Sequence, residues 1–355
     1  SSPFPRARGK VRMGATYRLQ PTLWSKQMLT TRLCTLLGIN FPIINAPMAG
    51  TATAELATAV SKAGAFGMIG AGANPDPTWL LEQVHAVREK TSQPFGVGFS
   101  SSFPGLEKAI EAALDAQVDA IGHSFVDPTP LVDQAKGSGV KIFAQVQTMS
   151  NAKKAVTAGA DVIIAQGSEA GGHTSHLGTL SFVRAVVKIA GDIPVVAAGG
   201  IADGPGLAAA LMLGAEGAWI GTRFVASLEW AGPEWAKGQV VLADADDTIL
   251  TNVYDLVAEA PYNLDVIGDR VIRNSFTDTW HGRETEMMTQ KNELREEIAI
   301  ASAAGDATTA PVRAGAASGL IRSIEPASYI IREIVSQAED LLKHQTEKLL
   351  REPLN

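Results

Sequence analysis

Short apolar runs rich in β-branched residues alternate with alanine-rich segments of helical character from residue 43 onward. Eight of these runs are strand candidates: 43–48, 67–72, 95–100, 120–125, 141–148, 161–167, 194–200 and 217–224. Their C-terminal ends follow one another at intervals of 19 to 33 residues, the length of a strand, a helix and two loops. Continuous apolar strands that alternate with helices predict a parallel sheet that is covered on both faces.

Eight such units predict a (β/α)8 TIM barrel, with an open doubly wound sheet as the alternative. The segments between the strands, among them 52–62, 78–90, 105–116 and 207–213, are the expected helices. We assign residues 28–230 to the barrel. Residues 231–355 are expected to form a mostly helical C-terminal extension that packs on the barrel and serves as a lid or a dimer contact.

The composition agrees with one large folded unit. Of 355 residues, 46% are hydrophobic and 19% are charged, which provides enough apolar material for a large core and excludes disorder of the bulk. The chain has 34 glycines and only 6% aromatic residues. Glycine in such numbers indicates tight turns and close backbone approach.

The charge is distributed unevenly along the chain. Residues 1–27 contain six basic and no acidic residues, so the net charge of −7 divides into +6 for this segment and −13 for the rest. We interpret residues 1–27 as a leader or as residues left from an expression vector, with Met28 as the native start. The acidic body argues against nucleic acid or an anionic membrane as partner.

Several kinds of site and compartment are disfavoured. The single cysteine, Cys34, cannot form an intramolecular disulfide and suggests a reducing compartment, so we expect a cytoplasmic protein, or an organellar one if the leader is native. No apolar run approaches the ~20 residues of a membrane span. The histidine and cysteine spacings contain no metal-binding motif, and neither a GxSxG nor a P-loop motif is present. No metal is therefore expected.

In a TIM barrel the active site lies at the C-terminal ends of the strands. The seventh and eighth strand candidates end in Gly199-Gly200 and Gly221-Thr222. Bare backbone N–H groups at these two ends are typical of a phosphate site. Asp203-Gly204-Pro205 is expected to begin the helix that follows. The alternative is that these glycines serve only tight turns.

The longest gap between strands holds the segment 166–176, QGSEAGGHTSH. Its Gly171-Gly172 pair frees the backbone to wrap a planar ligand and presents His173, which can exchange protons at neutral pH. Glu169 either orients this loop or is a surface charge. His123 and Ser124, at the end of the fourth strand, are expected to point toward the mouth of the barrel, where His123 acts either as a catalyst or as a hydrogen-bonded wall.

These motifs resemble those of the nitronate monooxygenase family, formerly called 2-nitropropane dioxygenases. The resemblance lies in NAPM at 45–48, in EAGGHT at 169–174 and in AAGGIADGPGLAAALMLGAEGAWIGTRF at 197–224. It covers residues 33–230 and resumes weakly at 315–326. Flavin-dependent enoyl-ACP reductases and quinone reductases share these motifs, so the resemblance indicates fold and cofactor better than substrate.

The resemblance implies a TIM barrel that binds FMN without a metal and oxidises alkyl nitronates, or nitroalkanes as well, with O2 to a carbonyl compound and nitrite. His173 falls on the family's catalytic histidine. By the same resemblance, the residues expected to contact the flavin or its phosphate are Ala46, Pro47, Met48, Gln145, Gln166, Gly171, Gly172, Gly199, Gly200, Gly221 and Thr222.

The sequence also departs from its relatives at two positions. Some relatives have a lysine where this chain has Gln145, and a glutamine where it has Ala316. Because reductases share the motifs, an FMN-dependent NAD(P)H reductase of a quinone or an enoyl thioester is the alternative function, and a non-catalytic barrel that binds a phosphorylated ligand is a third. The expected partners are a small nitronate, O2 and a second copy of the chain.

Overall fold

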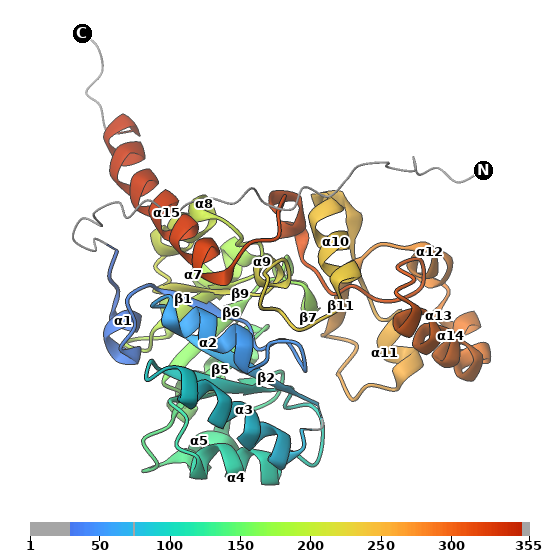
Figure 1. Cartoon of the computed structure of the whole chain (residues 1–355), viewed down its shortest axis with the longest axis horizontal. Coiled ribbons are helices and arrows are strands. Elements are labelled where there is room, and N and C mark those ends of the chain that lie inside the picture. The colour runs from blue at the N-terminus through green and yellow to red at the C-terminus, as the bar shows by residue number, and fades with distance from the viewer. Residues whose placement is uncertain (1–28, 74, 350–355) are drawn as a thin grey trace.

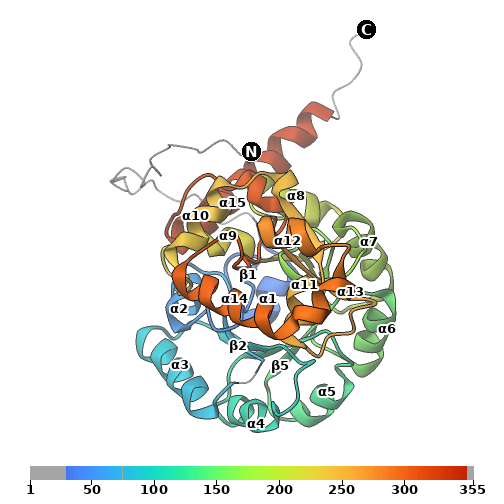
Figure 2. The same ribbon diagram turned by 90° about the vertical axis from the view of Figure 1, so that its right-hand side faces the viewer.

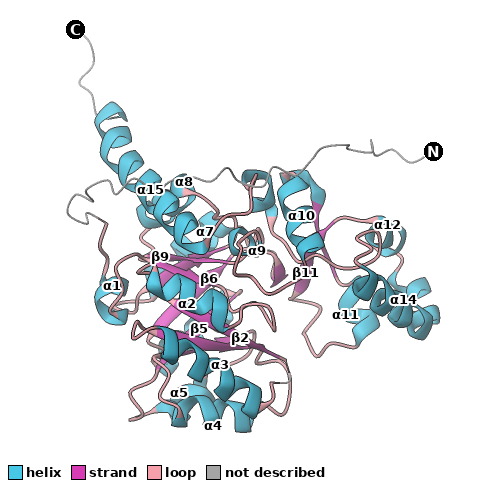
Figure 3. Cartoon of the chain, in the orientation of Figure 1, coloured by secondary structure: helices cyan, strands magenta, loops and turns pink. Residues whose placement is uncertain are grey.

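The structure is a computed structural model that describes residues 29–73 and 75–349. The leader expected at 1–27 lies outside the described residues. Figure 1 shows a barrel with a second lobe beside it, made of the helices from α11 (Val253–Ala258) to α14 (Lys291–Ala304), and the long helix α15 (Ala327–Leu349) along its flank. Figure 3 shows the strands of the barrel at the centre, surrounded by helices.

The eight predicted strands form one parallel sheet. They are β1 (Ile43–Asn45), β2 (Gly67–Gly72), β3 (Phe95–Phe99), β4 (Ala120–Ser124), β5 (Lys141–Val146), β6 (Val162–Gln166), β8 (Val195–Ala198) and β9 (Gly217–Ile220). Their order is β1-β9-β8-β6-β5-β4-β3-β2, and a parallel bridge between Ile44 and Phe66 joins the two ends. The (β/α)8 barrel is confirmed, and the open-sheet alternative is wrong.

Helices follow the strands and form a ring around them (Figure 2). They are α2 (Ala54–Lys62), α3 (Pro77–Lys90), α4 (Glu107–Asp115), α5 (Thr129–Ala135), α6 (Met149–Ala158), α7 (Thr179–Ile189) and α8 (Gly204–Met212); α1 (Arg32–Leu37) precedes the first strand. Helix α8 begins as predicted, because the side chain of Asp203 accepts a hydrogen bond from the Gly206 N–H and Pro205 lies in the first turn.

Alternate side chains of each strand face the barrel interior or the surrounding helices. Met68, Phe143 and Trp219 belong to the buried inner cluster. On β4, a Cβ at Gly122 would meet the side chains of Met68 and Trp219, so Gly122 faces inward. His123 therefore points outward, toward the helices.

Gly70 on β2 makes a close contact with the turn after β1. A Cβ at Gly70 would lie 2.2 Å from the Met48 carbonyl oxygen. We expect Gly70→Ala to lower the free energy of unfolding by about 2 kcal/mol or more, because backbone must move to accept the methyl group. Urea denaturation followed by circular dichroism measures this change. Gly238→Ala is the control: no atom lies within 4 Å of its Cβ position, so its stability should be equal or slightly higher.

The C-terminal extension is mostly helical, as predicted, but it also contributes to a small sheet. After the short helix α9 (Thr222–Val225), which ends the barrel, its elements are α10 (Glu234–Leu242), β10 (Thr248–Thr251), α11 (Val253–Ala258), β11 (Gly268–Ile272), α12 (Ser275–Trp280), α13 (Glu284–Met287), α14 (Lys291–Ala304) and α15 (Ala327–Leu349). An antiparallel sheet of order β10-β11-β7 joins the extension to β7 (Gly172–Thr174) of the barrel. This sheet was not predicted from the sequence.

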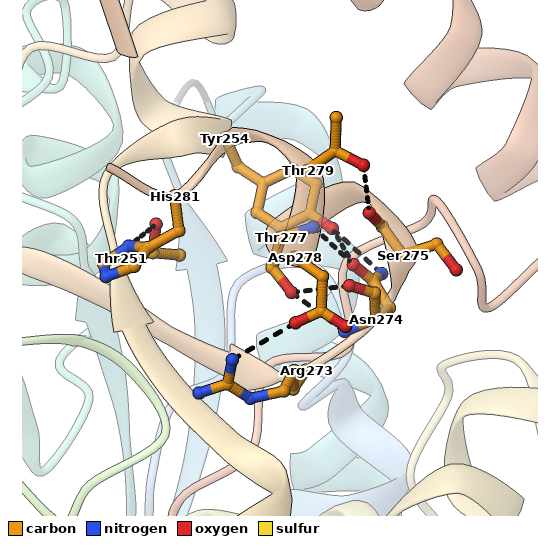
Figure 4. A network of polar contacts seen from close by, with 9 residues as sticks. All are labelled: Thr251, Tyr254, Arg273, Asn274, Ser275, Thr277, Asp278, Thr279 and His281. Atoms are coloured by element: carbon orange, nitrogen blue, oxygen red, sulfur yellow. Dashed lines mark hydrogen bonds and ion pairs between the residues drawn. The ribbon is translucent and has the colours of Figure 1, made fainter. Parts of the chain in front are cut away.

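The side chain of Asn274 connects three parts of the extension (Figure 4). It caps α12 by accepting a hydrogen bond from the Thr277 N–H, and its amide nitrogen donates to the hydroxyl of Tyr254 on α11. The same nitrogen is 3.2 Å from the carbonyl oxygens of Ala307 and Ala310. Asn274 therefore fixes α11 relative to the chain that leads to residue 313.

Helix α15 packs against α8 and α2 of the barrel (Figure 1). Its apolar face contributes Ile330, Ile331 and Ile334 to the main core. None of the helices described between residues 29 and 349 is both long and apolar enough to cross a membrane.

Candidate functional site

A cavity of about 600 Å³ lies at the C-terminal ends of the barrel strands, between the barrel and the extension. All twelve residues predicted for catalysis or cofactor binding line it: Ala46, Pro47, Met48, Gln145, Gln166, Gly171, Gly172, His173, Gly199, Gly200, Gly221 and Thr222. The structure thus brings together residues from the ends of five barrel strands, β1, β5, β6, β8 and β9, and from β7. Their individual roles stay predictions.

The turn after β1 forms one wall of the cavity. The side-chain amide of Asn45 donates to the Met68 carbonyl, and its oxygen accepts from the Met68 N–H at 2.8 Å. A Cβ at Gly98 would lie 2.2 Å from the Pro47 ring. Bare backbone at Gly98, as at Gly70, therefore serves to pack this turn, rather than to contact a ligand directly.

The side-chain oxygens of Gln145 and Gln166 each accept a hydrogen bond from a neighbouring side chain. The Ser124 hydroxyl donates to Gln145 Oε1 at 2.7 Å, and Gln147 Nε2 donates to Gln166 Oε1 at 2.9 Å. Because both acceptor oxygens are engaged, Gln145 and Gln166 have their NH2 groups left to donate to a ligand in the cavity.

The ends of β8 and β9 form a glycine-lined recess that suits the phosphate of FMN. Gly199 and Gly200 have φ values of +98° and +76°, a backbone shape that other residues rarely adopt. A Cβ at Gly221 would meet only the Ala46 methyl, at 3.4 Å, so this position opens into the cavity. The Thr222 hydroxyl accepts a hydrogen bond from the Gly315 N–H. The residues at these two strand ends therefore fit the phosphate of FMN. The start of α8, which follows Gly200, does not line the cavity.

Glu169 orients the loop after β6, which resolves the two alternatives left by the sequence. Its carboxylate accepts hydrogen bonds from the backbone N–H and the hydroxyl of Thr179, the first residue of α7. Its carbonyl oxygen accepts from the Ala316 N–H at 3.0 Å. The extension thus contacts this loop through the backbone at Ala316, the position where relatives often carry glutamine.

His173 lies on strand β7, where it pairs with Asp269 of β11. Its Nε2 atom is 2.9 Å from Oδ1 of Asp255 on α11. The ring of Tyr262 stacks on the imidazole with the two centroids 3.9 Å apart. His173 is thus held from two sides by residues of the extension, and Nδ1 is the ring nitrogen left for a ligand.

A charge cluster continues behind His173, made of two buried carboxylates and the half-exposed guanidinium of Arg313. Asp255 and Asp269 are 3% and 0% exposed, and one guanidinium nitrogen of Arg313 is 2.9 Å from Asp269. The Asp269 carboxylate holds the pKa of Arg313 above its ordinary value. Ligand atoms of His173, Asp255 and Asp269 lie within 4.8 Å of one another, close enough to share a cation, but Arg313 already brings a positive charge there.

Aromatic side chains form the outer wall of the cavity. Phe103 and Phe125 pack edge-on against Tyr262 at centroid distances of 5.5 and 5.3 Å. Burial raises the pKa of the Tyr262 phenol to about 12, and the hydroxyl is hydrogen-bonded to Ser100. Tyr262 therefore stays neutral at physiological pH and connects the extension to the end of β3.

One sequence prediction of a side-chain position was wrong, and three important residues were missed. His123 does not line the cavity, because strand alternation turns it toward the helices while Ser124 faces inward; burial lowers its pKa. The missed residues are Asp255, Tyr262 and Arg313. A signal existed for Asp255, which lies in the run VYDLV: an acid inside an apolar helical segment indicates a buried, partnered carboxylate.

Comparison with known proteins finds the same family that the sequence motifs resemble. The sequence profile described as nitronate monooxygenase matches residues 30–109 and 99–337. A probable nitronate monooxygenase of Staphylococcus saprophyticus is 33% identical over 272 residues, which cover 63% of this chain and 76% of that protein.

Two further similar proteins carry other descriptions. A (3aS,4S,5R,7aS)-5-hydroxy-7a-methyl-1-oxo-octahydro-1H-indene-4-carboxyl-CoA dehydrogenase of Rhodococcus jostii is 32% identical over 239 residues, 67% of each chain. The structure of FabK from Thermotoga maritima superposes with a TM-score of 0.82 at 34% identity, covering 90% of this chain and 100% of that one.

Proposed function

Because the chain belongs to the nitronate monooxygenase family of oxidoreductases, we propose that it binds FMN and oxidises alkyl nitronates, and also neutral nitroalkanes, with O2 to a carbonyl compound and nitrite. The observation that carries this proposal is the convergence of His173 with the glycine-lined recess in one cavity. A basic group beside a flavin site is what deprotonation and oxidation of a nitro compound require.

The residues of this chain would hold FMN along the cavity. Gly199, Gly200, Gly221 and Thr222 would bind the phosphate, and the NH2 groups of Gln145 and Gln166 would donate to polar atoms of the cofactor. When bound, the flavin supplies the redox chemistry and transfers electrons to O2. The protein supplies binding, orientation and proton handling.

His173 would handle the proton. With Nε2 bonded to Asp255, the lone pair on Nδ1 is available to remove the proton from the carbon next to the nitro group of a neutral nitroalkane. For a substrate that is already a nitronate, the protonated imidazole would instead donate a hydrogen bond to a nitronate oxygen. Tyr262 and Phe125 would exclude water from this side of the substrate.

Aerobic incubation of the purified protein with ethyl nitronate tests the proposal. We expect O2 uptake and nitrite release without NADH or NADPH, measured with an oxygen electrode and a colorimetric nitrite assay. Nitrite release no faster than that of a heat-denatured control would contradict it.

A second candidate is an FMN-dependent NAD(P)H reductase of an enoyl thioester or a quinone. The likeness to FabK and to a CoA-thioester dehydrogenase favours it, since both similarities exceed 30% identity. The two candidates differ in the reductant, so oxidation of NAD(P)H by the enzyme distinguishes them.

A further inference from the structure

We infer that Asp255 is the positioning residue for His173: its carboxylate accepts the Nε2–H bond, presents Nδ1 to the substrate, and stabilises the imidazolium formed when Nδ1 takes a proton. This inference rests on the proposed function for its kinetic test. The contact itself does not depend on the substrate.

The geometry gives Asp255 no comparable second role. Its Oδ1 atom is 2.9 Å from His173 Nε2, and its Oδ2 atom is buried without a hydrogen-bond partner among the described residues. Asp255 does not cap its helix, which begins two residues earlier at Val253. A carboxylate that is only 3% exposed is costly to bury unless a charged partner compensates for it.

The charges around Asp255 suit a histidine that takes a proton from the substrate. Asp269 is fully buried nearby, its β11 strand pairs with the strand of His173, and Arg313 is its ion-pair partner. Two carboxylates and one guanidinium leave one negative charge that is not balanced within the cluster when His173 is neutral. Protonation of Nδ1 supplies the missing positive charge.

The proton step balances without a further reactant. The C–H bond beside the nitro group breaks, the proton forms a bond to Nδ1, and the electron pair moves into the C=N bond of the nitronate. Nε2–H remains hydrogen-bonded to Asp255. The product pair is then a nitronate anion facing an imidazolium whose charge Asp255 stabilises.

Steady-state kinetics of Asp255→Asn on nitroethane and on ethyl nitronate test this role. We expect kcat/KM to fall about 100-fold on the neutral compound and less than about 5-fold on the nitronate, since only the first requires proton removal. The kinetic isotope effect with nitroethane deuterated beside the nitro group should rise, because proton removal becomes more rate-limiting. Asp265→Asn is the matched control and should behave as wild type, because Asp265 is an exposed acid in the loop that follows α11.

Equal losses on both substrates with an unchanged isotope effect would mean a purely structural role and would overturn the inference. A second readout holds even if the enzyme oxidises no nitronate. In proton NMR spectra of the wild type, an Nε2–H bonded to a buried carboxylate gives a resolved signal downfield of the amides. We expect this signal to vanish in both His173→Gln and Asp255→Ala. Its persistence in Asp255→Ala, or its absence in the wild type, would also overturn the inference.

A cation held by His173, Asp255 and Asp269 is the competing explanation of the cluster. Metal analysis of the purified holoenzyme, followed by assay after dialysis against EDTA, distinguishes the two. We expect less than stoichiometric metal and unchanged activity. A stoichiometric metal ion whose removal abolishes activity would assign Asp255 to that ion instead.

Discussion

Replacement of His173 by alanine is expected to lower kcat/KM for nitroethane by about 100- to 1,000-fold while the protein retains FMN. The imidazole is the basic group beside the flavin recess, and the backbone of β7 is held by its pairing with β11 rather than by the side chain. With ethyl nitronate, which needs no deprotonation, the loss should be smaller. Nitrite release with the two substrates, together with the flavin-to-protein absorbance ratio, measures both effects.

His176→Ala is the matched control for this prediction. His176 lies in the same loop but is exposed and does not line the cavity, so its removal should change neither activity nor flavin content. If His173→Ala turned over nitroethane as fast as the wild type, His173 would have no part in proton removal. Loss of flavin from His173→Ala would instead mean that His173 contributes to FMN binding.

The second large effect is expected from Gly221→Glu, which should abolish FMN binding without unfolding the protein. The φ of Gly221 is −104°, which any residue adopts, and a Cβ there would point into open cavity. The new carboxylate would then occupy the phosphate recess and repel the phosphate dianion. We expect the affinity for FMN to fall by about 100-fold or more, as measured by fluorescence titration of the apoprotein.

Gly238→Glu provides the same change at a position outside the cavity. Its Cβ would lie in open space on helix α10, so FMN affinity and the unfolding midpoint should match those of the wild type. Full flavin content in Gly221→Glu would show that the phosphate binds elsewhere. Unfolding of that variant would be visible in circular dichroism and separates a folding defect from a binding defect.

The barrel could be predicted from the sequence because its signals are local and repeated. Each strand is a short apolar run, each is followed by a helical segment, and all eight appear in the structure. The position of the cavity could also be predicted from the glycine-rich strand ends, because the C-terminal ends of parallel strands meet at one face of a barrel. All twelve residues predicted for catalysis or cofactor binding line the cavity, whereas His123, at the end of the fourth strand, does not.

The half of the site formed by the extension could not be predicted in this way. Asp255 is 82 residues from His173 along the chain, and the contact forms only because β7 pairs with β11. Strand β7 has only three residues, too few for an alternating pattern to be recognised. The direction of the His123 side chain was predicted wrongly. Successive side chains of a strand point to opposite faces, so His123 and Ser124 cannot both point toward the mouth of the barrel.

The extension therefore has a larger role than packing. It supplies Asp255, Tyr262 and Arg313 to the cavity. Its backbone N–H groups also donate to the barrel: that of Ala316 to the Glu169 carbonyl oxygen in the loop after β6, and that of Gly315 to the Thr222 hydroxyl after β9. The expected division into barrel and extension remains useful for describing the sequence, but the candidate site is formed by both parts. A second copy of the chain, expected as a partner, stays a prediction.

The central claim is that this chain uses nitronates, and not NAD(P)H, to reduce a bound FMN. Anaerobic mixing of the yellow holoenzyme with ethyl nitronate, NADH or NADPH in separate experiments tests it most directly, with flavin absorbance as the readout. We predict rapid bleaching by the nitronate and none by either nicotinamide on the same time scale. Rapid bleaching by NADH or NADPH, with none by the nitronate, would contradict the account and favour the reductase.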